Sequence, residues 1–399
     1  MDTGDDVRTR PPADGLVSIP VLVRIIMALA AAALVAGILG GLLRAGVLDA
    51  GLAGVAPFGS AVVAHAALMI CAFFGTVIGI ERAVALKRNW AFLAPALAGA
   101  GGIAVLLGEH PGSNWLFAAA ATVFVAVNIV VVTRQRAAHT VLLLVAAIAW
   151  LAGAGLQLAQ PGAAASIGWW FGFLVITIAA ERLELTRLMP RRRGSGAILA
   201  AAVAGLLVGA VAAGFAPGPG GVLFGLSLLV LAAWGFAFDI ARRTIRTSGA
   251  SRYMAVCLLA GYAWLGIGGL AWIGMSIGLA GARDAALHAI GLGFVFDMVM
   301  AHALVILPAV AKIRLAYRPV FYLGFGIMQV SLMLRLFGAP LDAGLRGIGA
   351  ALNAVAILVF AMTIVGVALH VRRAAYAELR LSKSQTRSKP IRRENASKG

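Results

Sequence analysis

Short charged segments divide this chain into a series of long apolar stretches. The composition is 62% hydrophobic and 12% charged, with a mean hydropathy of +0.97, which is more apolar than a soluble core requires. A transmembrane helix needs about 20 consecutive apolar residues. The sequence therefore predicts an all-α polytopic membrane protein with about twelve transmembrane helices, at residues 19–43, 50–80, 90–108, 114–133, two within 137–180, two within 194–238, 253–278, 284–312, 320–338 and 348–371.

Lysine and arginine alternate between the loops. The loops that follow the second, fourth, sixth, eighth and tenth predicted spans are basic, whereas the loops between them hold almost no positive charge. The positive-inside rule places both termini in the cytoplasm, and the formal net charge of +18 then reflects topology and does not imply nucleic acid. We expect a cytoplasmic segment at residues 1–18, a membrane domain at 19–371 and a basic disordered tail at 372–399. The expected location is the inner membrane of a bacterium, with the lipid bilayer as partner.

A short repeated sequence occurs in the second and sixth predicted spans. Glu81-Arg82 and Glu181-Arg182 each lie at the cytoplasmic end of a helix that runs inward, four helices apart. The tenth span occupies the corresponding third position, so the chain could consist of three four-helix units. Because adjacent Glu and Arg side chains point in different directions on a helix, we expect each to pair with another span. A proton entrance is the alternative interpretation.

The tenth predicted span carries three ionisable residues among apolar ones, namely His288, Asp297 and His302. Ionisable groups inside a membrane are costly and by default mark a functional site. On an α-helix with about 3.6 residues per turn, the two histidines share a face and Asp297 lies on about the opposite side. Asp297 could be protonated by desolvation, pair with another helix or relay protons.

His65 of the second span and His288 of the tenth are expected at a similar depth below the outer surface, whereas His302 is expected in the inner half of the membrane. Two imidazoles that face each other across a gap suit a six-coordinate haem iron between apolar walls. Small neighbours such as Ala64 and Gly291 leave room for a flat cofactor. We therefore predict one b-type haem with His65 and His288 as metal ligands, and His302 as a second ligand or polar partner. Hydrogen-bonded packing histidines are the alternative.

Twelve spans, cytoplasmic termini and outer-half histidines on the second and tenth spans resemble subunit I of the haem–copper oxidases. In that family these two helices supply the axial ligands of the low-spin haem, and the matching positions here are His65 and His288. The copper-ligating histidines of the sixth and seventh spans have no counterpart in this sequence, and Ala286 and Ile290 stand where a second haem ligand is found. This resemblance implies a haem without an oxygen-reducing centre.

The chain is also similar to the NnrS-type proteins, which are bacterial twelve-span membrane proteins, in length, Gly/Ala-rich texture and a His-containing second span followed by small residues. This resemblance implies haem and copper content and a role in relieving nitric-oxide stress. That family carries His-x-His in the second span, where this sequence has only His65, with Val63 and Ala67 at the neighbouring positions. The departure puts copper in doubt.

Two functions follow from these patterns. The first is a haem protein that acts in electron transfer or in nitric-oxide or haem handling, and that could work with another redox or membrane protein. The second is a proton-coupled secondary transporter of a small solute, which would use Asp297 and the paired Glu and Arg residues. A scaffold for another membrane complex is a third reading, and the sequence leaves open whether the protein is an enzyme.

Overall fold

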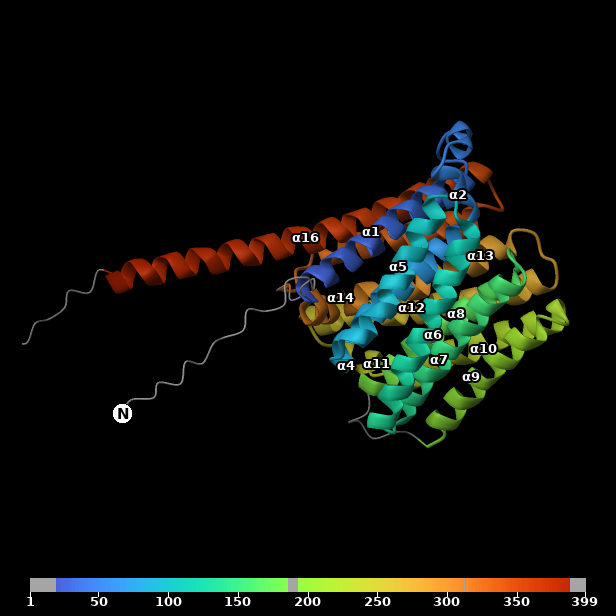
Figure 1. The fold of residues 1–399 in the computed structure, drawn as a ribbon, viewed down its shortest axis with the longest axis horizontal. Coiled ribbons are helices and arrows are strands. Elements are labelled where there is room, and N and C mark those ends of the chain that lie inside the picture. The colour runs from blue at the N-terminus through green and yellow to red at the C-terminus, as the bar shows by residue number, and fades with distance from the viewer. Residues whose placement is uncertain (1–18, 186–192, 312, 314, 388–399) are drawn as a thin grey trace, which may run out of the picture.

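The computed structural model describes residues 19–185, 193–311, 313 and 315–387, and this part of the chain contains helices and loops but no strand (Figure 1). Twelve of the described helices are long and apolar enough to cross a membrane, which confirms an all-α polytopic membrane protein. In chain order the helices are α1 (Ile19–Arg44), η1 (Ala50–Gly54), α2 (Phe58–Val63), α3 (His65–Ala67), η2 (Leu68–Phe74), α4 (Gly75–Leu86), η3 (Asn89–Phe92), α5 (Leu93–Leu106), α6 (His110–Arg134), α7 (Ala138–Ala159), α8 (Ala165–Leu185), α9 (Ser195–Ala212), α10 (Pro217–Phe238), α11 (Ala241–Thr244), α12 (Gly249–Ser276), α13 (Ala282–His288), η4 (Ala289–Phe296), α14 (Asp297–Ala311), α15 (Phe321–Met333), η5 (Leu334–Gly338) and α16 (Ala343–Arg387).

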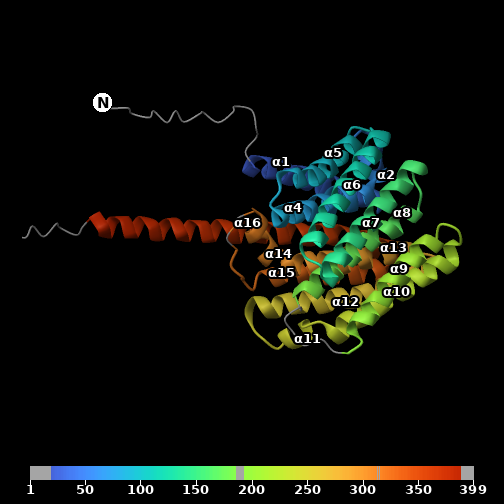
Figure 2. The same cartoon turned by 60° about the horizontal axis from the view of Figure 1, so that its bottom comes forward.

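Consecutive spans pack side by side, and the second, sixth and tenth spans meet in the middle of the bundle (Figures 1 and 2). Helix α8 contacts both η2 and η4, and α14 contacts α4. These three spans are more buried than the other candidate spans of the described chain. Each run of four helices thus contributes one central helix, which agrees with the three four-helix units suggested by the repeated Glu-Arg sequence.

Three π-helical segments, η2, η4 and η5, interrupt the spans. A π-helix has more residues per turn than an α-helix, and such segments are rare and frequently found at functional sites. Segments η2 and η4 begin close after His65 and His288. Because η4 lies between His288 and His302, it rotates the lower half of the tenth span relative to the upper half. The α-helical spacing used for the sequence therefore does not describe which residues of this span share a face.

The last helix is longer than predicted. The disordered tail was expected from residue 372, whereas α16 continues as a helix to Arg387 and projects beyond the rest of the bundle (Figure 1). The run of residues after the span is rich in Arg, Ala and Leu, which have high helix propensity, and this composition explains the continuation. Residues 388–399 and the predicted cytoplasmic segment 1–18 lie outside the described residues.

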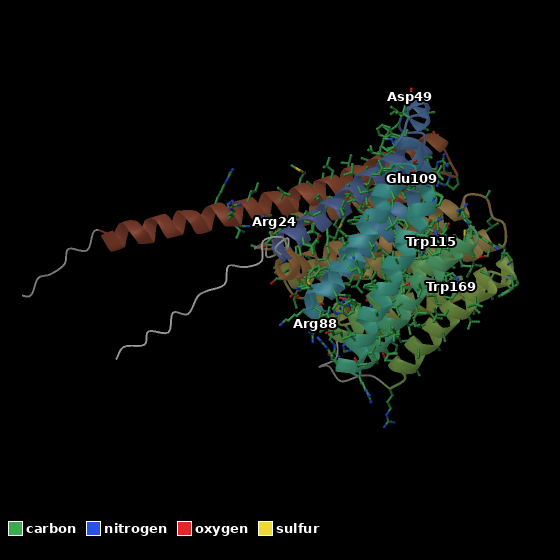
Figure 3. All side chains as sticks on the ribbon, in the orientation of Figure 1. Arg24, Asp49, Arg88, Glu109, Trp115 and Trp169 are labelled. Carbon is green, nitrogen blue, oxygen red and sulfur yellow. The ribbon has the colours of Figure 1, made fainter. Side chains whose placement is uncertain are left out.

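Charged side chains distinguish the two ends of the bundle. Figure 3 shows Arg24 and Arg88 toward one end and Asp49 and Glu109 toward the opposite end. The loops with Arg88 and with Arg134-Gln135-Arg136 lie at the same end because α5 and α6 run in opposite directions between them. The bundle therefore has a basic end and an end almost without basic residues.

Candidate functional site

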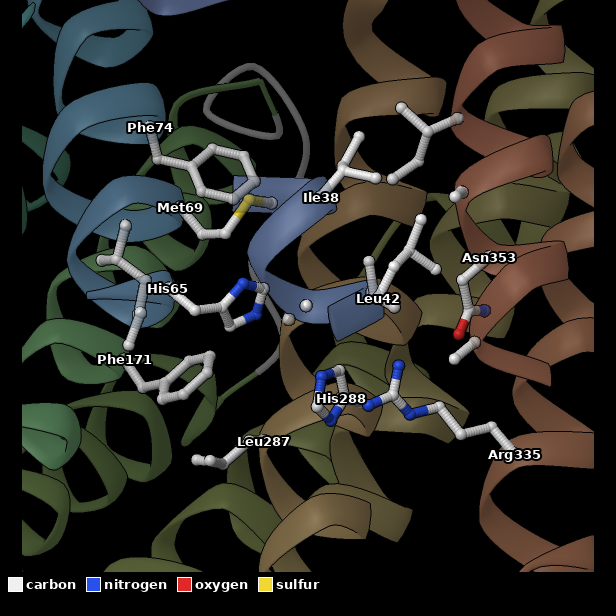
Figure 4. Close-up of a pocket in the computed structure, with 18 of the residues that line it drawn as sticks. Ile38, Leu42, His65, Met69, Phe74, Phe171, Leu287, His288, Arg335 and Asn353 are labelled. Atoms are coloured by element: carbon white, nitrogen blue, oxygen red, sulfur yellow. The ribbon is translucent and has the colours of Figure 1, made fainter. Parts of the chain in front are cut away.

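A pocket opens at the level of His65 and His288, between α1, η2, α8, η4 and α16 (Figure 4). The space inside and in front of the pocket amounts to about 870 Å³, part of which is open to the surroundings of the protein. Its walls are mostly apolar, and the polar residues that line it are His65, His288, Arg335 and Asn353. The name histidine pocket is used below for this space. Its larger apolar side chains are Ile38, Leu42, Met69, Phe74, Phe171 and Leu174.

His65 is the first residue of α3, and it follows a break at Ala64, where the backbone angles φ −98° and ψ 20° are not helical. Its Nδ1 lies 2.7 Å from the backbone oxygen of Gly37 on α1. A carbonyl oxygen can only accept, so Nδ1 carries the proton and Nε2 has a lone pair. Helix α1 approaches the ring closely because Gly41 has no side chain: a Cβ there would lie 2.9 Å from Cε1 of His65.

His288 is the last residue of α13 and is held by Asp284, one turn earlier. Its Nδ1 lies 2.9 Å from the backbone oxygen of Asp284 and 3.1 Å from Oδ1 of the same residue. Both atoms are acceptors, so Nδ1 again carries a proton, and in the neutral ring Nε2 has the lone pair. Arg335 of η5 donates to both carboxylate oxygens of Asp284, from Nη2 at 2.9 Å and from Nε at 3.1 Å. The pocket therefore has a fixed tautomer on each histidine.

The two imidazole rings lie next to each other. Their centroids are 6.4 Å apart and their planes are inclined by 29°, and Figure 4 shows both rings at the edge of the pocket. Within the described residues no hydrogen bond reaches Nε2 of either ring. The second and tenth spans thus bring His65 and His288 to one level, which agrees with the similar depths predicted for them. No described protein group donates to Nε2 of either imidazole.

A second polar region lies at the basic end of the bundle. Nη2 of Arg82 donates to Oε1 of Glu81 at 2.8 Å and to Oε1 of Glu181 at 2.5 Å, so the second and sixth spans are joined by an ion pair. Arg182 forms a two-pronged bond with Asp239, from Nε at 2.7 Å and from Nη2 at 2.8 Å. Arg82, Glu181 and Arg182 thus pair with other spans as expected, whereas Glu81 binds Arg82 of its own span.

Asp239 follows α10 directly and lies outside the membrane-spanning segments. Its carboxylate also accepts hydrogen bonds from the Tyr262 hydroxyl at 2.7 Å and from the backbone N–H of Ala241 at 2.8 Å. Burial raises the pKa of Asp239, but the hydrogen bonds and positive charge of Arg182 outweigh this effect and hold the pKa below its usual range. Asp239 is therefore an ionised anchor for Arg182.

His302 lies in this second region and not in the histidine pocket. Its Nδ1 lies 2.7 Å from the backbone oxygen of Met298, and its Nε2 lies 3.3 Å from Nη1 of Arg182. Arginine has only donors, so Nε2 of His302 accepts this bond and both ring nitrogens are occupied. Of the three histidines predicted to bind a cofactor, His65 and His288 lie together in the structure. His302 is instead a polar partner of Arg182.

Asp297 is fully buried, with 0% of its surface exposed, and it pairs with another span. Nε2 of Gln329 on α15 lies 2.9 Å from one carboxyl oxygen and 3.1 Å from the other. The orientation of this amide is fixed because Oε1 of Gln329 accepts from the indole N–H of Trp264 at 2.6 Å. Asp297 therefore cross-links the tenth and eleventh spans, which is one of the alternatives left open by the sequence.

The residues that hold the two histidines were not found by sequence reasoning. Asp284 stands four residues before His288, a spacing at which helical side chains meet, so a signal was present for this pair. Gly37 and Arg335 come from the first and eleventh spans, and nothing in the sequence links them to the histidines. Among the described residues, no group of three or more His, Cys, Asp and Glu side chains is arranged to hold a metal ion.

Comparison with known proteins gives a family but no activity. No curated protein and no solved structure matches the chain significantly. Residues 23–369 match the family described as "Domain of unknown function (DUF8744)", and because this match covers most of the sequence, the chain belongs to that family.

Proposed function

We propose that this protein is a haem-binding integral membrane protein that acts in electron transfer or in nitric-oxide or haem handling. The ligands would be Nε2 of His65 and Nε2 of His288, with the b-type haem held between the second and tenth spans. The observation that carries the proposal is the pair of imidazole lone pairs beside one apolar pocket. The NnrS-like resemblance of the sequence is compatible with this role.

The residues present fit such a group. A metal–imidazole nitrogen bond is about 2 Å long, and a ring centroid lies roughly 1 Å behind its nitrogen, so two axial imidazoles have centroids roughly 6 Å apart. The centroids of His65 and His288 are 6.4 Å apart. Ligating histidines usually donate their other ring N–H to a carbonyl or carboxylate, which fixes the tautomer, and both histidines do so here.

A haem held by His65 and His288 would supply one-electron transfer. His65 and His288 would hold the iron, and their Nδ1 partners would keep both rings in place. Phe74, Phe171 and Leu174 would exclude water from the faces of the macrocycle. The apolar walls and the hydrogen-bonded histidines would keep the structure of the site the same in the oxidised and the reduced states of the haem.

We place the protein in the inner membrane of a bacterium, with both termini in the cytoplasm. The support is the alternation of basic and non-basic loops along the sequence. The basic end of the bundle would then face the cytoplasm, and the histidine pocket would lie in the outer half of the membrane. An electron partner for the haem would be another redox or membrane protein.

The absorption spectrum of the purified protein tests the proposal. After expression with added haem and purification in detergent, we expect a Soret band and sharp reduced-minus-oxidised bands, and we expect His65→Ala and His288→Ala each to lose most of both. His302→Ala and the exposed His370→Ala are controls that retain the bands. A colourless wild-type protein would refute the proposal, and proton-coupled uptake that is abolished by Asp297→Asn would then favour a transporter.

A further inference from the structure

The two histidines of the pocket differ in the group that accepts their Nδ1 proton. His65 donates to a neutral peptide oxygen, that of Gly37, at 2.7 Å. His288 donates to the peptide oxygen of Asp284 at 2.9 Å, and the Oδ1 carboxylate atom of the same residue lies 3.1 Å from Nδ1. One imidazole is therefore next to a full negative charge and the other is not.

Arg335 determines how much of that charge His288 experiences. Its guanidinium binds both oxygens of Asp284, and Nη2 binds the same Oδ1 atom that lies near Nδ1 of His288. Figure 4 shows the guanidinium of Arg335 beside His288. Oδ1 of Asp284 thus accepts from Arg335 and lies close to Nδ1 of His288, so the cation offsets part of the negative charge beside the ring.

We propose that Asp284 is a positioning residue that increases the electron-donor strength of His288, and that Arg335 limits this effect. The inference rests on the haem site proposed above. A carboxylate that accepts the second N–H of a ligating histidine makes that ligand more basic. A more basic axial ligand stabilises the higher oxidation state of the iron, so Asp284 lowers the reduction potential and Arg335 raises it.

Asp284→Asn and Arg335→Gln separate this role from a purely structural one. Asn keeps the shape and the acceptor oxygen but lacks the charge, so we expect a higher potential than in the wild type. Gln removes the competing cation, so we expect a lower potential. A tenfold change in the relative affinity of the site for the two oxidation states corresponds to about 59 mV for a one-electron couple, and we expect changes of about this size in opposite directions.

The measurement is a spectroelectrochemical titration of the haem-loaded protein. Matched controls are Asp342→Asn and Arg283→Gln, whose side chains are exposed near the same end of the bundle, and they leave the potential unchanged. Asp284→Glu keeps the charge, so its potential stays nearer to the wild type than that of Asp284→Asn. If Asp284 and Arg335 only joined α13 to η5, both variants would lower haem occupancy alike without opposite shifts, and the inference would be wrong. A wild-type protein without haem would instead refute the proposed function.

Discussion

At the scale of single residues, the state of two ring nitrogens decides what the histidine pocket can bind. His65 and His288 each use Nδ1 for a hydrogen bond to another group of the protein and keep Nε2 as an acceptor beside apolar walls. A ligand that accepts electron pairs, such as a metal ion, would satisfy both nitrogens, which an apolar ligand cannot do.

The substitution Gly41→Ala tests whether the close approach of α1 positions His65 in the pocket. A Cβ at this position would lie 2.9 Å from Cε1 and 3.3 Å from Nδ1 of His65, so Gly41→Ala should push the ring from its place. We expect haem affinity to fall about tenfold, or about 1.4 kcal/mol, with little change in the helix content measured by circular dichroism. Gly366→Ala is the matched control, because a Cβ on that helical glycine meets open space. Equal affinities for the two variants would show that α1 does not position His65.

The sequence supports prediction of the two pocket histidines better than prediction of the residues that hold them. His65 and His288 could be paired from depth alone, because transmembrane helices place each residue at a nearly fixed level. Gly37, Asp284 and Arg335 act through hydrogen bonds whose geometry depends on how three helices are rotated. A single sequence gives no measure of that rotation, so these residues became visible only in the structure.

At the scale of helices, the bundle is joined by polar contacts between spans that are distant in sequence. Arg82 and Glu181 join the second span to the sixth, and Arg182 and Asp239 join the sixth to the end of the eighth. The ends of the spans could be read from charge and Pro-Gly breaks. The π-segments could not, because η2 and η4 have the same apolar composition as ordinary helix.

The substitution Arg182→Met tests how much these contacts contribute to the stability of the bundle. Arg182→Met leaves Asp239 buried without its cation, and breaking a buried ion pair in this way costs about 3–5 kcal/mol. We expect a marked fall in the thermal unfolding midpoint in detergent, measured by circular dichroism. Replacing both partners, in Arg182→Met with Asp239→Leu, should recover much of the loss, whereas the exposed Arg243→Met changes little. A midpoint that is the same in Arg182→Met and Arg243→Met would contradict this role of the pair.

At the scale of the whole molecule, three runs of four helices surround a common centre. Each run provides one central span, and the histidine pocket lies where the first and third runs meet, with α8 of the second run as a further wall. The sequence suggested this plan through Glu81-Arg82 and Glu181-Arg182, and the packing of the three central spans agrees with it. Assembly of the histidine pocket therefore requires all three runs, although only two of them supply its histidines.

The orientation of the bundle gives a separate prediction. If the basic loops face the cytoplasm, a fluorescent protein fused to the C-terminus will fluoresce, and alkaline phosphatase fused at the same place will be inactive. Phosphatase inserted into the loop near Glu109, at the opposite end of the bundle, serves as the control and will be active (Figure 3). The reverse pattern would place the histidine pocket in the cytoplasmic half of the membrane.

The low-temperature electron paramagnetic resonance spectrum of the oxidised, haem-loaded protein tests the central claim most directly. Axial ligation by His65 and His288 predicts a low-spin ferric signal in the wild type and in His302→Ala. Loss of either pocket histidine should abolish the low-spin signal. A wild-type protein that takes up no haem, or a low-spin signal that survives both His65→Ala and His288→Ala, would contradict the proposed site.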